Sequence, residues 1–208
     1  MTTSPIEILT IGHSSMSYEE FVRSLRSASV TAVADVRSAP FSRRNPQFNR
    51  DVLRDELRLD GIAYVFLGEE LGGRPKERQY FCEGVADYEK MAKSSDFERG
   101  VLRVIEGSKQ YRIALMCSEH DPLECHRCLL VGRALHERGA AVKHILSNQT
   151  VEDQADIERR LIQWSRQGGE DLFQNYEGRL AAAYRKRSSK VAYSERAPAH
   201  RHPSRYSD

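Results

Sequence analysis

The chain lacks the two features that would direct it into or across a membrane. Its sequence contains no apolar run that approaches the roughly 20 residues of a membrane-spanning helix. Residues 1–11 have neither the basic start nor the long apolar core of a secretory signal peptide. We therefore expect a cytoplasmic protein with no membrane partner.

Hydrophobic residues and cysteines are both scarce. Of the 208 residues, 39% are hydrophobic and 30% are charged, so a sizeable part of the chain should be exposed. The four cysteines are Cys82, Cys117, Cys125 and Cys128. Because thiols stay reduced in the cytoplasm, metal binding or thiol reactivity explains them better than structural disulfides do.

The shortage of apolar residues is greatest at the end of the chain. Residues 185–208 carry seven Lys or Arg against two acidic residues, a net charge near +5, whereas residues 1–184 carry 25 basic and 28 acidic residues, near −3. A segment of this composition cannot recover its ordering entropy by burial. We predict one α/β domain over residues 1–184 and a disordered basic tail over residues 185–208. That tail is either a solvated extension or a weak contact for nucleic acid.

Strand and helix patterns alternate along the predicted domain. Short apolar segments typical of strands occupy residues 8–11, 31–34, 62–67, 111–116 and 141–146. Helical periodicity occupies residues 17–28, 51–59, 87–106 and 122–138, with two outer helices near 151–166 and 173–184. This order predicts an α/β fold, with a mostly parallel five-stranded sheet and helices on both of its faces.

Polar side chains stand where three of the predicted strands end. The three groups are Gly12-His13-Ser14, Asp35-Val36-Arg37 and Cys117-Ser118-Glu119. The carboxyl ends of parallel strands lie on one sheet edge, where open α/β sheets bind their ligands. A fourth group, residues 121–127, has the Asp N-cap and the following Pro of a helix start. We expect all four groups to form one site.

The order of the motifs along the chain is distinctive. It runs Thr10-Ile11-Gly12-His13-Ser14, Asp35-Val36-Arg37-x-x-Pro40-x-Ser42, Leu71-Gly72-Gly73 and Cys117-x-Glu119-x-x-Pro122-x-x-Cys125-His126-Arg127. Over about residues 6–147 this order resembles the bacterial and archaeal family called domain of unknown function 488. The resemblance implies that the motif set here is His13, Ser14, Asp35, Arg37, Ser42, Cys117, Glu119, Cys125, His126 and Arg127. The family name supplies no reaction.

Cys125 is the candidate nucleophile. A thiol close to a helix N-terminus and beside His and Arg should have a lowered pKa, which favours the attacking thiolate. Cys117, at a strand end, is a candidate second thiol, and His13 and Glu119 are candidate acid/base groups. The alternative is that both cysteines are small, buried apolar residues.

Metal ligation is a further possibility for the same thiols. Cys117, Cys125 and Cys128 together with an imidazole are ligand types that zinc prefers. On one helix, Cys125 and Cys128 would share a face, whereas His126 would project about 100° away from Cys125. His13 or Glu119 would then have to complete the site. The spacing fits no standard zinc module, and the sequence leaves the cofactor open.

The arginines at the strand and helix ends indicate an anion site. Arg37 follows Asp35 on the same strand face, so an ion pair can fix its guanidinium. Arg127 lies at a helix start, where backbone N–H groups favour anions. The candidate substrate-binding residues are Ser14, Asp35, Arg37, Ser42, Arg44, His126 and Arg127. The alternative is a structural ion-pair network of Asp35, Arg37, Glu119 and Arg127.

The loop of residues 38–50 interleaves three arginines with two phenylalanines. Cationic and aromatic faces together suit a nucleotide base or single-stranded nucleic acid. Alternatively, the phenylalanines anchor the loop while Arg43 and Arg44 stay solvated.

The leading hypothesis is an enzyme that acts on a phosphorylated or nucleotide-type substrate through a Cys/His/Arg pocket. One alternative is a non-catalytic nucleic-acid or nucleotide binding module. The other alternative is a metal-binding regulatory protein.

Overall fold

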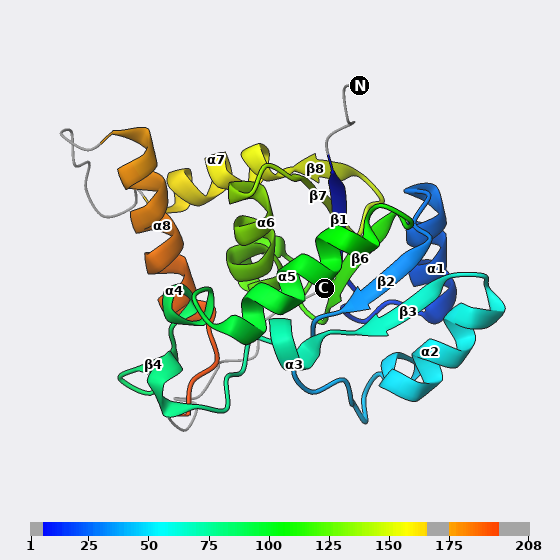
Figure 1. Ribbon diagram of the computed structural model, residues 1–208. Helices are drawn as coiled ribbons and strands as arrows, with labels where there is room; N and C mark the ends of the chain where they lie inside the picture. The colour runs from blue at the N-terminus through cyan, green and yellow to red at the C-terminus, as the bar shows by residue number, and fades with distance from the viewer. Residues whose placement is uncertain (1–5, 166–174, 196–208) are drawn as a thin grey trace, which may run out of the picture.

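The computed structural model of the chain describes residues 6–165 and 175–195 and has the predicted α/β fold (Figure 1). Its main sheet has the strand order β3-β2-β6-β1-β7-β8. The five parallel strands are those predicted, and a sixth, β8 (Val151–Asp153), runs antiparallel to β7. The parallel strands are β1 (Glu7–Gly12), β2 (Ala32–Asp35), β3 (Ala63–Phe66), β6 (Ile113–Cys117) and β7 (Ala141–Ile145).

The central position of β6 brings distant parts of the chain together. Every residue of β6 is buried, as expected for a parallel strand with both faces covered. Its register aligns Cys117 with Gly12 of β1 and Met116 with Asp35 of β2. This confirms the prediction that the polar groups after β1, β2 and β6 lie at one sheet edge.

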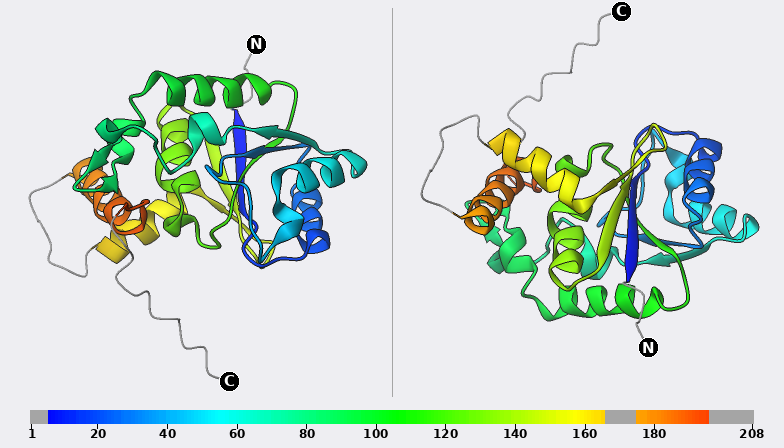
Figure 2. Two further views of the ribbon diagram at one scale, coloured as in Figure 1. Left: turned by 90° about the horizontal axis from the view of Figure 1, so that it is seen from below. Right: turned by 90° about the horizontal axis from the view of Figure 1, so that it is seen from above.

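Helices cover both faces of the sheet (Figure 2). Helices α1 (Tyr18–Ser27) and α2 (Arg50–Leu59) pack on one face, around Phe21, Leu53 and Leu57. The predicted capping box starts α1, where the side chains of Ser17 and Glu20 bond each other's backbone N–H groups. The other face is covered by α5 (Ser95–Gly107), the π-helical turn η4 (Arg127–Gly132) and α6 (Arg133–Glu137).

Two segments between β3 and β6 differ from the sequence prediction. The single helix expected over residues 87–106 is divided into α4 (Tyr88–Met91) and α5, because the Ser94 side chain accepts the N–H of Phe97 and starts a new helix. Residues 74–86 contain η2 (Arg78–Tyr80) and a hairpin of β4 (Phe81–Cys82) and β5 (Val85–Ala86). Strands of two residues are too short to show a periodic pattern. Helix α3 (Gly68–Leu71) directly follows β3, and the turn η1 (Pro46–Phe48) lies earlier, in the loop between β2 and α2.

Two C-terminal helices, α7 (Gln154–Ser165) and α8 (Tyr176–Val191), pack beside α6. A buried hydrogen-bond chain ties them to the sheet. The Nε2 of His144 on β7 bonds Gln154 Oε1 at 2.7 Å, Gln154 bonds the Tyr184 hydroxyl at 2.7 Å, and that hydroxyl donates to Glu158 at 2.8 Å. These bonds join both outer helices to β7.

The predicted tail begins inside α8, since residues 185–191 are helical. Three of its cations, Lys186, Arg187 and Lys190, lie 4.9–5.7 Å from the ring centre of Trp164 on α7. Cation–π contact therefore orders basic residues that composition alone assigned to a disordered segment. Residues 196–208 of the predicted tail lie outside the described residues. In the described ranges, no helix combines the length and the apolar character needed to cross a bilayer.

Candidate functional site

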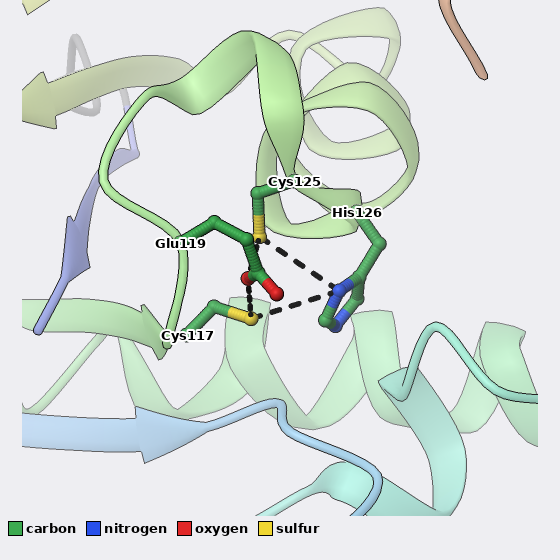
Figure 3. A group of neighbouring side chains, drawn as sticks. All are labelled: Cys117, Glu119, Cys125 and His126. Atoms are coloured by element: carbon green, nitrogen blue, oxygen red, sulfur yellow. Dashed lines mark hydrogen bonds between the residues drawn. The ribbon is translucent and has the colours of Figure 1, made fainter. Parts of the chain in front are cut away.

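Four side chains converge beyond the carboxyl end of β6 (Figure 3). They form what we call the Cys–Glu–His cluster, which consists of Cys117, Glu119, Cys125 and His126. One ligand atom from each residue lies within 4.8 Å of all the others. The Oε2 of Glu119 is 2.9 Å from Cys117 Sγ and 3.0 Å from Cys125 Sγ. The Nδ1 of His126 is 3.7 and 3.8 Å from the same two sulfurs.

The backbone between the two cysteines explains this convergence. Asp121 caps the short turn η3 (Pro122–Glu124) by accepting the N–H of Leu123. Cys125 then has extended dihedral angles, φ −137° and ψ 140°, before the chain enters η4. The geometry expected for two successive helical residues therefore does not apply, and Cys125 and His126 face the same point. Cys128, inside η4, is buried and is not a member of the cluster.

A hydrogen bond on the side of the ring away from the two sulfurs fixes the orientation of His126. Its Nε2 donates to the carbonyl of Val36 at 2.8 Å, so the Nδ1 side faces the two sulfurs. A Cβ at Gly73 would lie only 2.7 Å from His126 Cγ, so the Leu71-Gly72-Gly73 motif leaves space for the ring. Burial by itself would lower the pKa of His126, but the charge of Cys125 raises it. A double glycine by itself indicates only a turn, so nothing in the sequence pattern assigned Gly73 or Val36 to the site.

Arg127 places a buried positive charge behind the cluster. Its side chain is fully buried and donates to the carbonyls of Glu119 at 2.7 Å and His120 at 3.0 Å. Among the described residues, its Nε has no hydrogen-bond partner and no carboxylate forms an ion pair with it. Its backbone N–H donates to Cys125 Sγ at 3.4 Å. A buried cation needs a nearby negative charge, and a thiolate at Cys125 would supply it.

The two cluster thiols differ in their acidity. Burial by itself would raise the pKa of Cys125, but the hydrogen bond from Cys117 and the charges of Arg127 and His126 lower it well below its usual value. Burial, and then the hydrogen bond to Cys125, raise the pKa of Cys117. Burial and the negative charge of Cys125 also raise the pKa of Glu119. The pair therefore ionises at Cys125 first.

Arg37 forms the predicted ion pair with Asp35 next to the cluster. Its Nε and Nη2 donate to the two oxygens of Asp35 at 2.9 and 2.7 Å, and Nη2 also donates to the Phe48 carbonyl at 2.8 Å. The Tyr64 hydroxyl donates to Asp35 at 2.7 Å. Asp35 and Arg37 thus form a separate buried pair, while Glu119 faces the cysteines and Arg127 bonds carbonyls. The four residues do not form one ion-pair network.

His13 belongs to the Arg37 group and not to the cluster. Its Nδ1 donates to the Ser14 carbonyl at 3.0 Å, and its Nε2 lies 3.3 Å from Arg37 Nη1. The ring stacks on Phe48 with centroids 4.1 Å apart. Burial, followed by the charge of Arg37, lowers the pKa of His13 to about 4. The imidazole is therefore neutral near neutral pH.

The 38–50 loop borders the group formed by Arg37 and His13, through Phe48 and Asn45. The Ser42 hydroxyl accepts the N–H groups of Arg44 at 3.2 Å and Asn45 at 3.1 Å, and the Asn45 side chain donates to the Ser14 carbonyl at 3.3 Å. Its two phenylalanines differ, since Phe48 is fully buried whereas Phe41 is 71% exposed. Arg43 and Arg44 are both exposed. Phe48 anchors the loop, and Phe41 and the two arginines face solvent.

The comparisons with known proteins identify a family and no relative of known activity. The family model described as Domain of unknown function DUF488 matches residues 17–134, more than half of the 208-residue chain. That range includes the whole Cys–Glu–His cluster and the Asp35–Arg37 pair, and it leaves out His13. None of the curated proteins and none of the solved structures gives a significant match. The chain belongs to the DUF488 family.

Proposed function

We propose that this protein is an enzyme that acts on a phosphorylated or nucleotide-type substrate at the Cys–Glu–His cluster. The observation that carries the proposal is the meeting of two thiols, a carboxylate and an imidazole within 4.8 Å, at the sheet edge where open α/β folds hold ligands. Ionisable groups with shifted pKa values that gather in such a crevice are typical of functional sites.

The members of the cluster differ in exposure, which suggests their roles. Cys117 and Cys125 are 2% and 1% exposed, and His126 is 9% exposed, whereas Glu119 is an exposed residue. A substrate would therefore approach from the Glu119 side. Glu119 would accept or donate a proton there, and Arg127 would stabilise negative charge at Cys125 from behind.

The proposed substrate class rests on the 38–50 loop. Arg37 and Arg127 donate to internal acceptors and are buried, so we assign contact with the substrate phosphate to Arg43 and Arg44. Phe41 offers an exposed ring on which a base can stack. Asn45 connects this loop to Ser14 at the sheet edge.

Turnover by the purified full chain tests the proposal. The protein would be incubated with panels of nucleotides, sugar phosphates and short oligonucleotides, and products would be detected by mass spectrometry. We expect a product that forms with the wild type and with Cys82→Ser but not with Cys125→Ala or Glu119→Gln. Equal product formation by Cys125→Ala, or no product from any panel, would contradict the proposal.

A non-catalytic nucleic-acid binding module is the second candidate. It is favoured by the exposed ring of Phe41 beside two exposed arginines, and it needs no chemistry at the cluster. Salt-sensitive binding of an oligonucleotide that survives Cys125→Ala, without turnover of any panel member, would favour this second function.

A further inference from the structure

We propose that the Cys–Glu–His cluster is a zinc site in which Cys117, Cys125 and His126 are buried ligands and Glu119 is the exposed fourth ligand. This inference rests on the site of the proposed function and names its cofactor. It keeps Glu119 as a possible ligand from the sequence hypothesis, but it includes His126, which helical spacing directed away from Cys125, and leaves out Cys128 and His13.

The distances between the ligand atoms fit a tetrahedral zinc ion. With Zn–S bonds of about 2.3 Å and Zn–N bonds of about 2.0–2.1 Å, a sulfur and a nitrogen ligand are about 3.5 Å apart. The His126 Nδ1 lies 3.7 Å from Cys117 Sγ and 3.8 Å from Cys125 Sγ. An ion can therefore bind between these three atoms with little movement of the backbone.

Glu119 requires a small adjustment. Its Oε2 lies 2.9 and 3.0 Å from the two sulfurs, which is hydrogen-bonding distance. In a zinc tetrahedron the corresponding separations are longer by about 0.5 Å. Glu119 is an exposed residue, although its Oε2 lies against the two buried sulfurs, so zinc binding requires its side chain to withdraw by this amount when a metal ion replaces the thiol protons.

The surroundings of His126 are those of a metal ligand. Histidines that bind metals nearly always donate their second ring N–H to a carbonyl or carboxylate, which fixes the tautomer. The His126 Nε2 donates to the Val36 carbonyl at 2.8 Å, and this leaves the Nδ1 lone pair directed at the sulfurs. Gly73 has no side chain, and this leaves the space in which the ring lies, since an added Cβ would be 2.7 Å from His126 Cγ.

The charges also balance when a zinc ion is present. Two thiolates, one carboxylate and Zn²⁺ have a net charge of −1, and the buried guanidinium of Arg127 supplies +1 beside them. The Arg127 backbone N–H donates to Cys125 Sγ, as second-sphere donors do to metal-bound thiolates. With Glu119 bound, the four protein ligands close the coordination sphere as in a structural zinc site. Glu119 is the one exposed ligand, so a substrate that displaced it would meet the three-ligand open site of a catalytic zinc centre and would free the Glu119 carboxylate for the proton transfer proposed above.

Metal analysis of the full-length protein tests the inference without any knowledge of the substrate. The chain would be stripped with a chelator, dialysed, and titrated with Zn²⁺ or with Co²⁺ as a spectroscopic probe. We expect binding of one equivalent of zinc and, with Co²⁺, a near-ultraviolet thiolate-to-metal charge-transfer band with the visible intensity of a tetrahedral site. Cys117 and Cys125 should resist alkylation when zinc is bound and react after chelation.

Variants separate the proposed ligands from the other cysteines. Cys125→Ser and His126→Ala should lose the stoichiometric metal, whereas Cys82→Ser and Cys128→Ala should retain it. Glu119→Gln changes an exposed residue and should fold normally, with weaker zinc binding than that of the wild type. Circular dichroism of each variant distinguishes loss of metal from loss of fold.

The outcomes for the metal and for the enzyme are distinguishable. A folded wild type that binds neither Zn²⁺ nor Co²⁺ with thiolate ligation would overturn the zinc site. If turnover then still depended on Cys125, the proposed enzyme would stand as a thiol enzyme. Stoichiometric zinc binding that is lost in Cys125→Ser and His126→Ala supports the zinc site, whether or not any panel substrate is converted. Failure to convert a panel substrate would count only against the proposed activity.

Discussion

The Nδ1 of His126 lies 3.7 Å from the Sγ of Cys117, nine residues earlier in the chain, while its Nε2 donates to the carbonyl of Val36. One imidazole therefore connects the end of β6 with the segment that leaves β2. The orientation of this ring depends on space left by Gly73, and this dependence can be tested directly.

Gly73→Ala should displace the His126 ring of the cluster, although Gly73 is not itself a member of the cluster. The added methyl group would lie 2.7 Å from Cγ of His126, and relieving such an overlap typically costs about 1–3 kcal/mol of folding free energy. We expect a lower urea midpoint and weaker Co²⁺ or Zn²⁺ binding. Gly107→Ala is the matched control, since its methyl group would meet only the flexible end of Ile113 at 3.1 Å. Equal effects of the two changes would contradict the role given to Gly73.

Arg37→Met should destabilise the protein strongly. The change removes one partner of an ion pair whose side chains are 5% and 0% exposed, and it leaves the Asp35 carboxylate buried without its guanidinium. Breaking a buried pair in this way typically costs about 3–5 kcal/mol of folding free energy. Arg54→Ala, which removes an exposed ion pair with Asp51, should cost at most about 1 kcal/mol. Urea unfolding of both variants measures the difference.

Stability should fall as the pH drops from about 6.5 toward 4, in part because of His144. Burial lowers the pKa of this side chain from its ordinary value of 6.5 to about 4. The folded protein therefore favours the neutral ring of His144. This ring stabilises the folded state fully above the pKa of the unfolded chain, 6.5, and its stabilisation is lost as the pH falls to the folded-state pKa of about 4. For such a shift the loss between about pH 7 and pH 5 is about 2 kcal/mol.

His144→Gln should reduce this pH dependence by about that amount, because the variant can still hydrogen bond but cannot titrate there. The free energy of unfolding would be measured in urea at several pH values for the wild type and the variant. His13 also has a pKa of about 4, so it should cause a pH dependence of the unfolding free energy of similar size that remains in the variant. Parallel pH curves for the two proteins would show that His144 is not responsible.

The double change Arg43→Ala and Arg44→Ala should weaken binding of single-stranded oligonucleotides and leave folding unchanged. For each phosphate that the variant no longer neutralises, the slope of log affinity against log salt should become shallower by about 0.7. Phe41→Ala should remove stacking worth about 1–3 kcal/mol. Fluorescence anisotropy at several salt concentrations measures both effects, and Arg99→Ala, an exposed residue on α5, is the control. Equally weakened binding by Arg99→Ala would indicate non-specific attraction.

The sequence alone determined the five parallel strands and the edge at which their polar ends meet. Apolar runs of strand length alternate with amphipathic segments such as 17–28, and this order permits few arrangements other than a parallel sheet with crossover helices. It also determined the Asp35–Arg37 pair, because residues two apart on a strand share a face. These features depend on local pattern and on register, both of which can be read from the residues.

Only the tertiary structure decided what the polar residues do at that edge. Cys125 and His126 face one point because Cys125 is extended between two turns, a backbone state that helical spacing does not reveal. Arg37 and Arg127 are occupied by internal acceptors, and the basic start of the predicted tail is helical because it packs on Trp164. The partners of a buried charge are contributed by distant segments, so burial and tertiary packing, which composition cannot give, determine its role.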